Sequence, residues 1–142
     1  MYPRGPGPQA LLLLLFLMAT TVFPQNEGTA YSDFLKRHQD NPKSDFEDDR
    51  TYCNLMMHRR NLNCQRSNTF IHASKWHLSS ICNSRGKNLD GNQNSKTLFP
   101  ITICILEKGS RGRLCHYSGE SKISRIRVTC SRGLPVHYIA HV

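Results

Sequence analysis

Six cysteines constrain the fold of this 142-residue chain more than any other feature of its sequence. An even number of cysteines in a small chain is typical of a secreted domain that is stapled by disulfides. Six cysteines allow fifteen pairings, and the spacing alone selects none of them. No Cys-x-x-Cys pair occurs, so we expect three disulfides rather than a zinc site. The cysteines are Cys53, Cys64, Cys82, Cys104, Cys115 and Cys130.

The N-terminus has the pattern of a secretory signal peptide. Arg4 precedes an unbroken apolar run at residues 11–16, and apolar or small residues continue to Phe23. The alternative is a membrane anchor, but a bilayer span needs about 20 apolar residues. We predict that residues 1–24 are a signal peptide, with cleavage somewhere between residues 24 and 30, and that residues 25–142 form a single secreted domain.

The charge of the chain is strongly basic, with a formal net charge of +9. Acidic residues gather at residues 45–49, whereas from residue 51 onward three acidic residues face fourteen lysines and arginines. A field of one sign attracts polyanions such as RNA, DNA, heparan-type glycans or anionic microbial membranes. Charge alone does not choose among these partners.

The order of the predicted elements, helices first and strands later, indicates an α+β fold with an antiparallel sheet. Apolar periodicity and helix-end signals predict helices at 31–39, 49–61 and 74–81. Strands are predicted at 68–72, 97–106, 114–117, 123–130 and 134–141. A polar loop is predicted at 83–95, and turns at 109–112, 117–119 and 131–133.

Three short motifs point to one family. Residues 34–38 read FLKRH, residues 64–70 read CQRSNTF, and residues 134–138 read LPVHY. With these motifs the chain resembles the vertebrate pancreatic-type ribonuclease superfamily, also called the ribonuclease A family. Its signature is a cysteine, a lysine, two variable residues and then Asn-Thr-Phe. Six cysteines instead of eight resemble the angiogenin branch.

The resemblance extends over essentially all residues beyond the predicted signal peptide, and it implies a specific architecture. Three short helices would pack on a bent antiparallel β-sheet. The implied disulfides are Cys53–Cys104, Cys64–Cys115 and Cys82–Cys130.

The resemblance also implies a reaction, cleavage of RNA on the 3′ side of pyrimidines through a 2′,3′-cyclic phosphate. This transesterification needs a base, an acid and a cation near the phosphate, and two histidines suit the first two roles. His38 would be the base and His137 the acid. Thr69 would read the base of the RNA, Asn68 would support the phosphate site and Tyr138 would pack beside the base. No metal and no cofactor is expected.

The sequence departs from the family pattern at the catalytic lysine, where it has Gln65. Loss of a charged donor at a phosphoryl transition state typically costs about 10²- to 10⁵-fold in rate. Arg66 is adjacent, but neighbours on an extended segment face opposite sides. Arg37 replaces a residue that is commonly glutamine, and our hypothesis is that it lies near the scissile phosphate and partly replaces the missing charge. The alternative is a solvated cation on the helix surface.

A further departure follows the second histidine. Fully active relatives usually have an aspartate two residues after it, which orients the imidazole, and this chain has Ile139. The acid would therefore lack its orienting partner.

A basic segment, His58, Arg59 and Arg60, resembles the segment that angiogenins use for nuclear uptake. The alternative is a charged helix C-terminus, where cations are favoured in any case. The polar loop at 83–95 resembles the angiogenin cell-binding loop.

Two functions follow as hypotheses. The first is a weak secreted endoribonuclease. The second is a catalytically impaired relative that acts as a cationic host-defence protein or as an angiogenin-like signalling or nucleic-acid-binding protein. We expect a monomer that is extracellular, with uptake and nuclear localisation as a further expectation. RNA and a ribonuclease inhibitor are expected partners.

Overall fold

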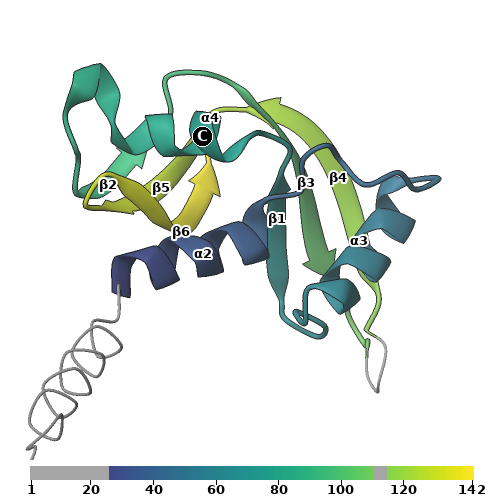
Figure 1. Ribbon diagram of the computed structural model, residues 1–142. Helices are drawn as coiled ribbons and strands as arrows, with labels where there is room; N and C mark the ends of the chain where they lie inside the picture. Colours follow the sequence, from purple (N-terminus) through teal and green to yellow (C-terminus); the bar gives the residue numbers. More distant parts are fainter. Residues whose placement is uncertain (1–25, 111–114) are drawn as a thin grey trace, which may run out of the picture.

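The structure, a computed structural model, describes residues 26–110 and 115–142 (Figure 1). The predicted signal peptide lies outside the described residues, as do parts of the predicted turn at 109–112 and of the predicted strand at 114–117. Within the described part of the chain, no helix is long and apolar enough to cross a membrane.

The three predicted helices are present, with shifted ends. They are α2 (Asn26–His38), α3 (Asp49–Arg59) and α4 (Lys75–Ser79). The Asp48 carboxylate caps α3 by accepting from the backbone N–H of Thr51 at 2.7 Å, and the Ser74 hydroxyl caps α4 by accepting from that of His77 at 3.1 Å. α2 begins earlier than residue 31, because polar residues extend the helix beyond the apolar positions that reveal it in the sequence.

The strands form two three-stranded antiparallel sheets, where we expected a single bent sheet. In one sheet the order is β1 (Ser67–Ile71), β3 (Phe99–Leu106), β4 (Tyr117–Ser124). In the other it is β2 (Gly91–Asn94), β5 (Ile126–Ser131), β6 (Leu134–His141). The strand predicted at 123–130 is in fact the end of β4 and most of β5, separated at Arg125. The chain passes from one sheet to the other at this residue. The sequence on both sides is of β type, so it does not indicate that the hydrogen-bonding partner changes.

The predicted turn at 117–119 is wrong, because these residues begin β4. Gly119 is a glycine for another reason: a Cβ there would lie 2.3 Å from the backbone oxygen of Asp49. The glycine therefore marks the close approach of α3 to the sheet rather than a turn.

The predicted loop at 83–95 contains two short elements. They are a 3₁₀ turn at Ser84–Gly86 and strand β2, which pairs with β5. All four residues of β2 are glycine, asparagine or glutamine, so the sequence has no apolar alternation that would indicate a strand.

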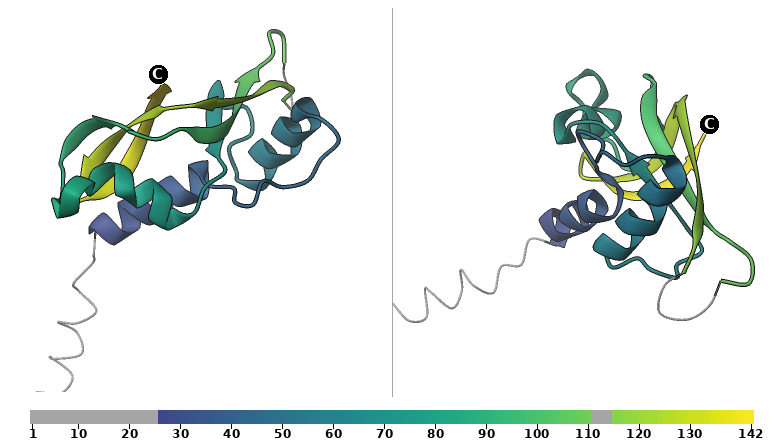
Figure 2. Two further views of the ribbon diagram at one scale, coloured as in Figure 1. Left: turned by 90° about the horizontal axis from the view of Figure 1, so that it is seen from above. Right: turned by 90° about the vertical axis from the view of Figure 1, so that its right-hand side faces the viewer.

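Two apolar clusters form the core, and α2 spans the junction between the two sheets. One cluster includes Phe34, Leu78 and Phe99, and the other includes Tyr52 and Phe70. α3 packs on β3 and β4, whereas α2 packs on β6 of one sheet and on β1 of the other (Figure 2). The C-terminal end of α2 is thereby placed where the two sheets meet.

The three disulfides have the pairing that the family resemblance implies. They join Cys53–Cys104, Cys64–Cys115 and Cys82–Cys130, with Cα separations of 5.5, 5.2 and 5.6 Å. The first ties α3 to β3, and the third ties the segment after α4 to β5. Each such bridge typically contributes about 2–4 kcal/mol of stability.

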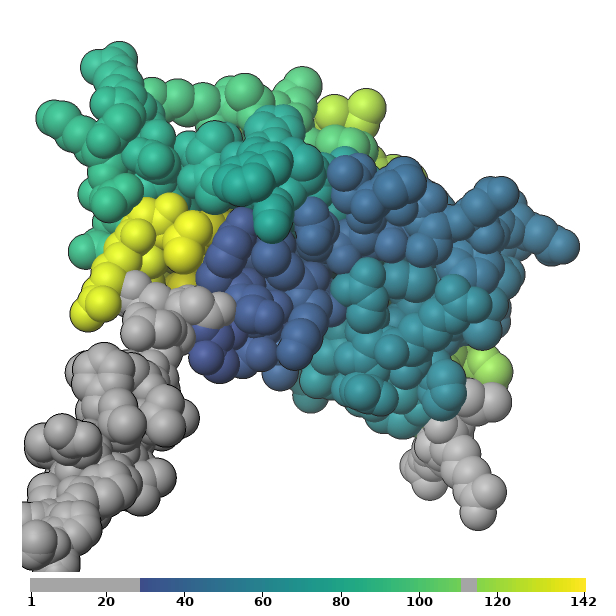
Figure 3. Space-filling model, viewed as in Figure 1, coloured from purple at the N-terminus to yellow at the C-terminus, as the bar shows by residue number. Residues whose placement is uncertain are grey.

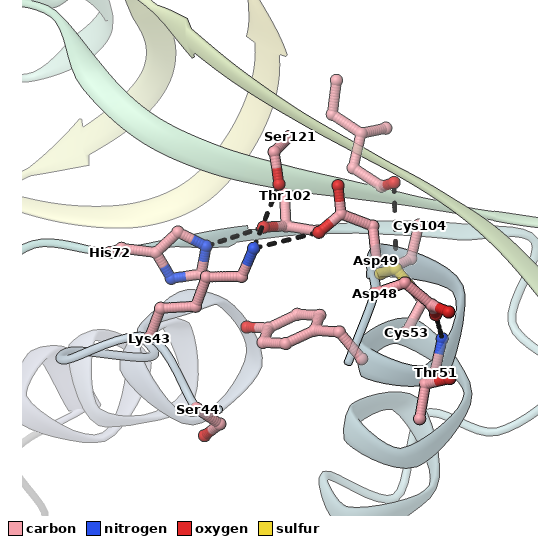
Figure 4. Close-up of polar contacts among 12 residues, drawn as sticks. Lys43, Ser44, Asp48, Asp49, Thr51, Cys53, His72, Thr102, Cys104 and Ser121 are labelled. Carbon is pink, nitrogen blue, oxygen red and sulfur yellow. Dashed lines mark hydrogen bonds and ion pairs between the residues drawn. A yellow bond between two sulfur atoms is a disulfide. The ribbon is translucent and has the colours of Figure 1, made fainter. Parts of the chain in front are cut away.

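A polar network around His72 connects the turn after α2 to the first sheet. Nδ1 of His72 donates to the backbone oxygen of Asp40, and Nε2 accepts from the Thr102 hydroxyl, both at 2.8 Å. Figure 4 shows the contact with Thr102, beside Lys43, which bonds Asp49 and Ser121. Both ring nitrogens of His72 are used within the fold, so this histidine has a structural role.

Candidate active site

His38 is the last residue of α2, and tertiary contacts fix its ring. Its Nδ1 lies 2.9 Å from the backbone oxygen of Thr69, and its ring packs against Phe34 and Tyr138 at centroid distances of 5.1 and 5.4 Å. A carbonyl oxygen only accepts, so Nδ1 carries the proton of this hydrogen bond. In the neutral ring, Nε2 is therefore left with a free lone pair.

The surroundings of His38 keep its imidazole neutral near pH 7. Burial and, to a smaller extent, the positive charges of Arg37 and His137 together lower the pKa of His38 to about 4, although the hydrogen bond to Thr69 acts in the opposite direction. A neutral imidazole with a free Nε2 is the form that accepts a proton.

A cavity of about 510 Å³ lies between α2 and β6, and it brings the two histidines together. Figure 3 shows the C-terminal strand, in yellow, beside the blue-purple α2 on the same face of the molecule. Arg37, the chain neighbour of His38, also lines the cavity. The lining residues are Ala30, Asp33, Phe34, Arg37, His38, Val136, His137 and Tyr138.

His137 is far less constrained than His38. It lies on β6, is exposed, and its ring has no hydrogen-bond partner among the described residues. Ile139 follows His137 by two residues on β6, where the pairing with β5 shifts register from Tyr138 to Ala140, and it is 42% exposed. The position at which fully active relatives usually have an orienting aspartate therefore has an apolar side chain.

β1 supplies two buried polar residues to the site. The Asn68 side-chain amide donates to the backbone oxygen of Arg37 at 2.9 Å, so it holds the last turn of α2. Thr69 holds His38 through its backbone oxygen. Asn68 thus contacts the backbone of α2, a role that the sequence analysis did not anticipate.

The Tyr138 hydroxyl is buried without a hydrogen-bond partner among the described residues. Burial raises the pKa of Tyr138, and the nearby Thr69 side chain offsets part of that rise, although the two hydroxyls do not have hydrogen-bond geometry. Tyr138 and Thr69 thus place two hydroxyl groups side by side near His38.

Gln65 and Arg66 do not line this cavity. Both are exposed just before β1. The Gln65 backbone oxygen accepts from the Tyr117 hydroxyl at 2.5 Å, and the Arg66 backbone oxygen accepts from the Leu106 N–H at 2.8 Å. Of the two cations considered for the missing lysine, Arg37 lines the cavity and Arg66 does not.

The basic segment at the end of α3 is divided between surface and interior. His58 and Arg59 are exposed, and the Arg59 guanidinium lies 5.2 Å from the ring centre of Phe46. Arg60 turns inward, and its guanidinium contacts the end of α2. The sequence predicted a charged C-terminus for α3. It contained no signal that Arg60 contacts the end of a different helix, α2.

Comparison with known proteins agrees with this geometry. A sequence profile of the family "Pancreatic ribonuclease" matches residues 29–139. The chain is 43% identical to a ribonuclease of Chelydra serpentina over 114 residues, which cover 78% of this chain and 96% of that protein. It is 36% identical to angiogenin of Mus musculus over 141 residues, which cover 94% and 93% of the two chains.

Solved structures give the same relationship. The crystal structure of green turtle egg white ribonuclease matches with a TM-score of 0.73 and 39% identity, covering 80% of this chain and 98% of that one. The X-ray structure of zebrafish RNase5 matches with a TM-score of 0.68 and 30% identity, covering 82% and 97%. The fold is ribonuclease A-like, and the chain belongs to the pancreatic ribonuclease family.

Proposed function

We propose that this chain is a secreted endoribonuclease of reduced activity, which cleaves RNA on the 3′ side of pyrimidines through a 2′,3′-cyclic phosphate. One observation carries the proposal: His38, with a free Nε2, lines the same cavity as His137. The family membership and the pair of histidines favour this function over a catalytically impaired host-defence protein.

The reaction uses the two histidines in sequence. Nε2 of His38 takes the proton of the ribose 2′-OH while the 2′ oxygen bonds to phosphorus. The bond from phosphorus to the 5′ oxygen breaks, and protonated His137 donates its proton to that oxygen. The products are a 2′,3′-cyclic phosphate and a free 5′-OH, and the two histidines have exchanged their protonation states.

Arg37 is our candidate for the charge that Gln65 does not provide. Its side chain is exposed, lines the cavity and affects the pKa of His38, which supports a position near the phosphate. A charged donor there would stabilise the negative charge of the transition state. The Thr69 and Tyr138 hydroxyls would contact the RNA base beside it.

The first experiment compares cleavage of a short fluorogenic pyrimidine-containing RNA by the refolded secreted domain, by His38→Ala and by His116→Ala. His116 is an exposed histidine outside the cavity, so it is the matched control. We expect loss of the base to reduce kcat/KM by about 10²- to 10⁴-fold. Equal activity of His38→Ala and His116→Ala would refute the proposed mechanism.

A second comparison tests Arg37. Arg37→Ala should reduce kcat/KM by about 10-fold or more, because it removes a charge beside the phosphate. Lys36→Ala removes a neighbouring cation that does not line the cavity, so it should change kcat/KM much less. If the two variants behave alike, Arg37 is a solvated cation without a special role.

Location and partners follow from the same proposal. The predicted signal peptide supports an extracellular protein, and the relatives named angiogenin support binding of a ribonuclease inhibitor. Uptake into the nucleus through the basic segment would rely mainly on His58 and Arg59, because Arg60 is engaged in the fold.

A basic pocket supports heparan-type glycans as a second class of partner. This pocket, of about 620 Å³, contains Arg85, Lys87 and Lys96, and no acidic residue lines it. Hydroxyl and amide side chains and two apolar ones, Ile81 and Leu89, complete its lining, and no aromatic ring lines it that could stack on a nucleobase. A sulfated sugar matches these groups better than a single-stranded RNA does.

Salt elution from immobilised heparin tests this assignment. The double variant Lys87→Ala with Lys96→Ala should elute at lower salt than Lys108→Ala with Lys122→Ala, which removes the same charge elsewhere on the surface. Equal elution would mean that net charge, not this pocket, governs glycan binding.

A further inference from the structure

The end of α2 and the residues just after it are held by contacts with β1. The backbone oxygen of Arg37 accepts from Asn68, His38 donates to the Thr69 oxygen, and the Asp40 N–H donates to the Ile71 oxygen at 3.0 Å. The last four carbonyl groups of any helix lack partners inside the helix, so such contacts decide how firmly it ends.

The carbonyl group of Lys36 lies one residue before these contacts, and its partner is Arg60, the residue that directly follows α3. Nη1 of Arg60 donates to the Lys36 oxygen at 2.6 Å. A cation at this end of a helix is also favoured by the helix dipole. Arg60 thus adds one contact, from a different element, to the turn that presents Arg37 and His38.

The Arg60 side chain is fixed by two further contacts. Nη2 lies 3.7 Å from Oδ1 of Asp40, and the guanidinium lies 5.8 Å from the ring centre of Phe70. The Asp40 carboxylate is almost fully buried, with 7% of its side chain exposed, and it also accepts from Tyr52 and Ser44. The planar fork of an arginine can donate to the Lys36 oxygen with one nitrogen and form an ion pair with Asp40 through the other, while it lies over an aromatic ring.

We propose that Arg60 is a positioning residue for the catalytic base, clamping the last turn of α2 so that His38 faces the cavity in one orientation. Arg60 acts through the Lys36 carbonyl and does not line the cavity. The same side chain therefore belongs to the machinery of catalysis rather than to a freely accessible basic segment. This inference rests on the proposed function, since a clamped base matters only where a base acts.

The effect of Arg60 is geometric rather than electrostatic. The charges that lower the pKa of His38 are those of Arg37 on α2 and His137 on β6, and the Thr69 carbonyl of β1 opposes them. Loosening the turn should expose the imidazole to water and raise the pKa of His38 from about 4 toward its ordinary value of 6.5.

The experiment compares Arg60→Ala with Arg59→Ala, which removes an equal charge from the adjacent, exposed position. Two quantities are measured: the kinetic constants on a pyrimidine-containing RNA, and the pKa of His38 by NMR titration of its ring. We expect Arg60→Ala to lower kcat by about 10- to 100-fold with a smaller change in KM, because a misplaced base affects chemistry more than binding. The pKa of His38 should rise, and Arg59→Ala should leave both quantities within about twofold of wild type, or 0.3 of a pKa unit.

A second variant keeps the test decisive if Arg60→Ala folds poorly. Arg60→Lys retains the charge and the aliphatic stem but lacks the two-nitrogen fork that contacts Lys36 and Asp40 at once, so it should show the same two changes at smaller size. Wild-type values of both quantities in Arg60→Lys, or equal behaviour of Arg60→Ala and Arg59→Ala, would overturn the inference. The NMR titration shows whether Arg60 positions His38 even if the wild-type protein cleaves no RNA. Absence of cleavage would count against the proposed function alone.

Discussion

His38 and His137 face one cavity from very different surroundings. His38 ends a helix, is largely buried, bonds a backbone carbonyl of β1 and packs between two rings. His137 lies on an exposed part of β6, and its ring has no hydrogen-bond partner in the part of the chain that the structure describes. The proposed base is therefore preorganised, whereas the proposed acid and the phosphate-binding groups are incomplete. Substitutions that raise the rate should therefore be those that complete the acid or the phosphate-binding groups.

The largest expected gain is at Gln65. Gln65 does not line the cavity, but Gln65→Lys would restore the cation of the family signature on a side chain longer than that of glutamine, and we expect kcat/KM to rise by about 100-fold or more. Asn83→Lys, which adds the same charge at an exposed position outside the family motifs, serves as the control in the same RNA cleavage assay. A gain that appears equally in both variants would reflect attraction of RNA by net charge alone.

The acid limb of the pH–rate profile tests whether His38, the preorganised base, has a lowered pKa. A base must be neutral, and the pKa of His38 is lowered to about 4 by burial. We therefore expect kcat/KM to fall only as the pH drops through about 4. A base with the ordinary pKa of 6.5 would already be about 100-fold less available at pH 4.5. An acid limb near pH 6.5 would mean that His38 is solvated.

The same shift predicts how stability depends on pH. Between pH 6.5 and 4 the unfolded chain protonates His38 while the folded chain does not, so this residue lowers the free energy of unfolding as the pH falls through that window. Urea unfolding at several pH values, for wild type and for His38→Gln, isolates the contribution. The dependence should be weaker in the variant between pH 4 and 6.5.

A smaller gain is expected at Ile139. Ile139→Asp restores the carboxylate of the family pattern two residues after His137, where we expect it to orient the imidazole and favour its protonated form. We expect kcat to rise by about 10-fold at most. Ile139→Asn has nearly the same shape without the charge, and a comparable gain in that variant would attribute the effect to polarity instead.

The smallest effect concerns Tyr138. Tyr138→Phe removes a buried hydroxyl that has no partner among the described residues, so the free energy of unfolding should rise by about 1 kcal/mol in urea denaturation. If the hydroxyl binds the RNA base, the same variant should bind a pyrimidine nucleotide more weakly. Unchanged stability would indicate that water already satisfies the hydroxyl.

Much of the fold was accessible from the sequence because local patterns report element type. Apolar periodicity and helix-end signals predicted the three helices, and strands were predicted where the structure has β1, β3 and β6. The strand β2 was missed because a strand of glycine and amide residues has no apolar alternation, and Gly119 was misread because a glycine that meets Asp49 looks like a glycine in a turn.

The candidate site divides in the same way. The motifs identified His38, His137, Thr69 and Arg37, and the structure brings these residues to one place. The contacts of Arg60 with Lys36 and of Asn68 with Arg37 join residues that are far apart in the chain, so no local pattern announces them.

The sequence by itself determined that this chain has six cysteines for three disulfides, a basic surface, the ribonuclease motifs and no lysine at position 65. Only the tertiary structure decided that the strands divide into two sheets, that His38 is mostly buried whereas His137 is exposed, and that Arg60 contacts the end of α2. The physical reason is that residue type and spacing fix local conformation and chemistry. Burial, partner choice and pKa depend on which distant segments pack together.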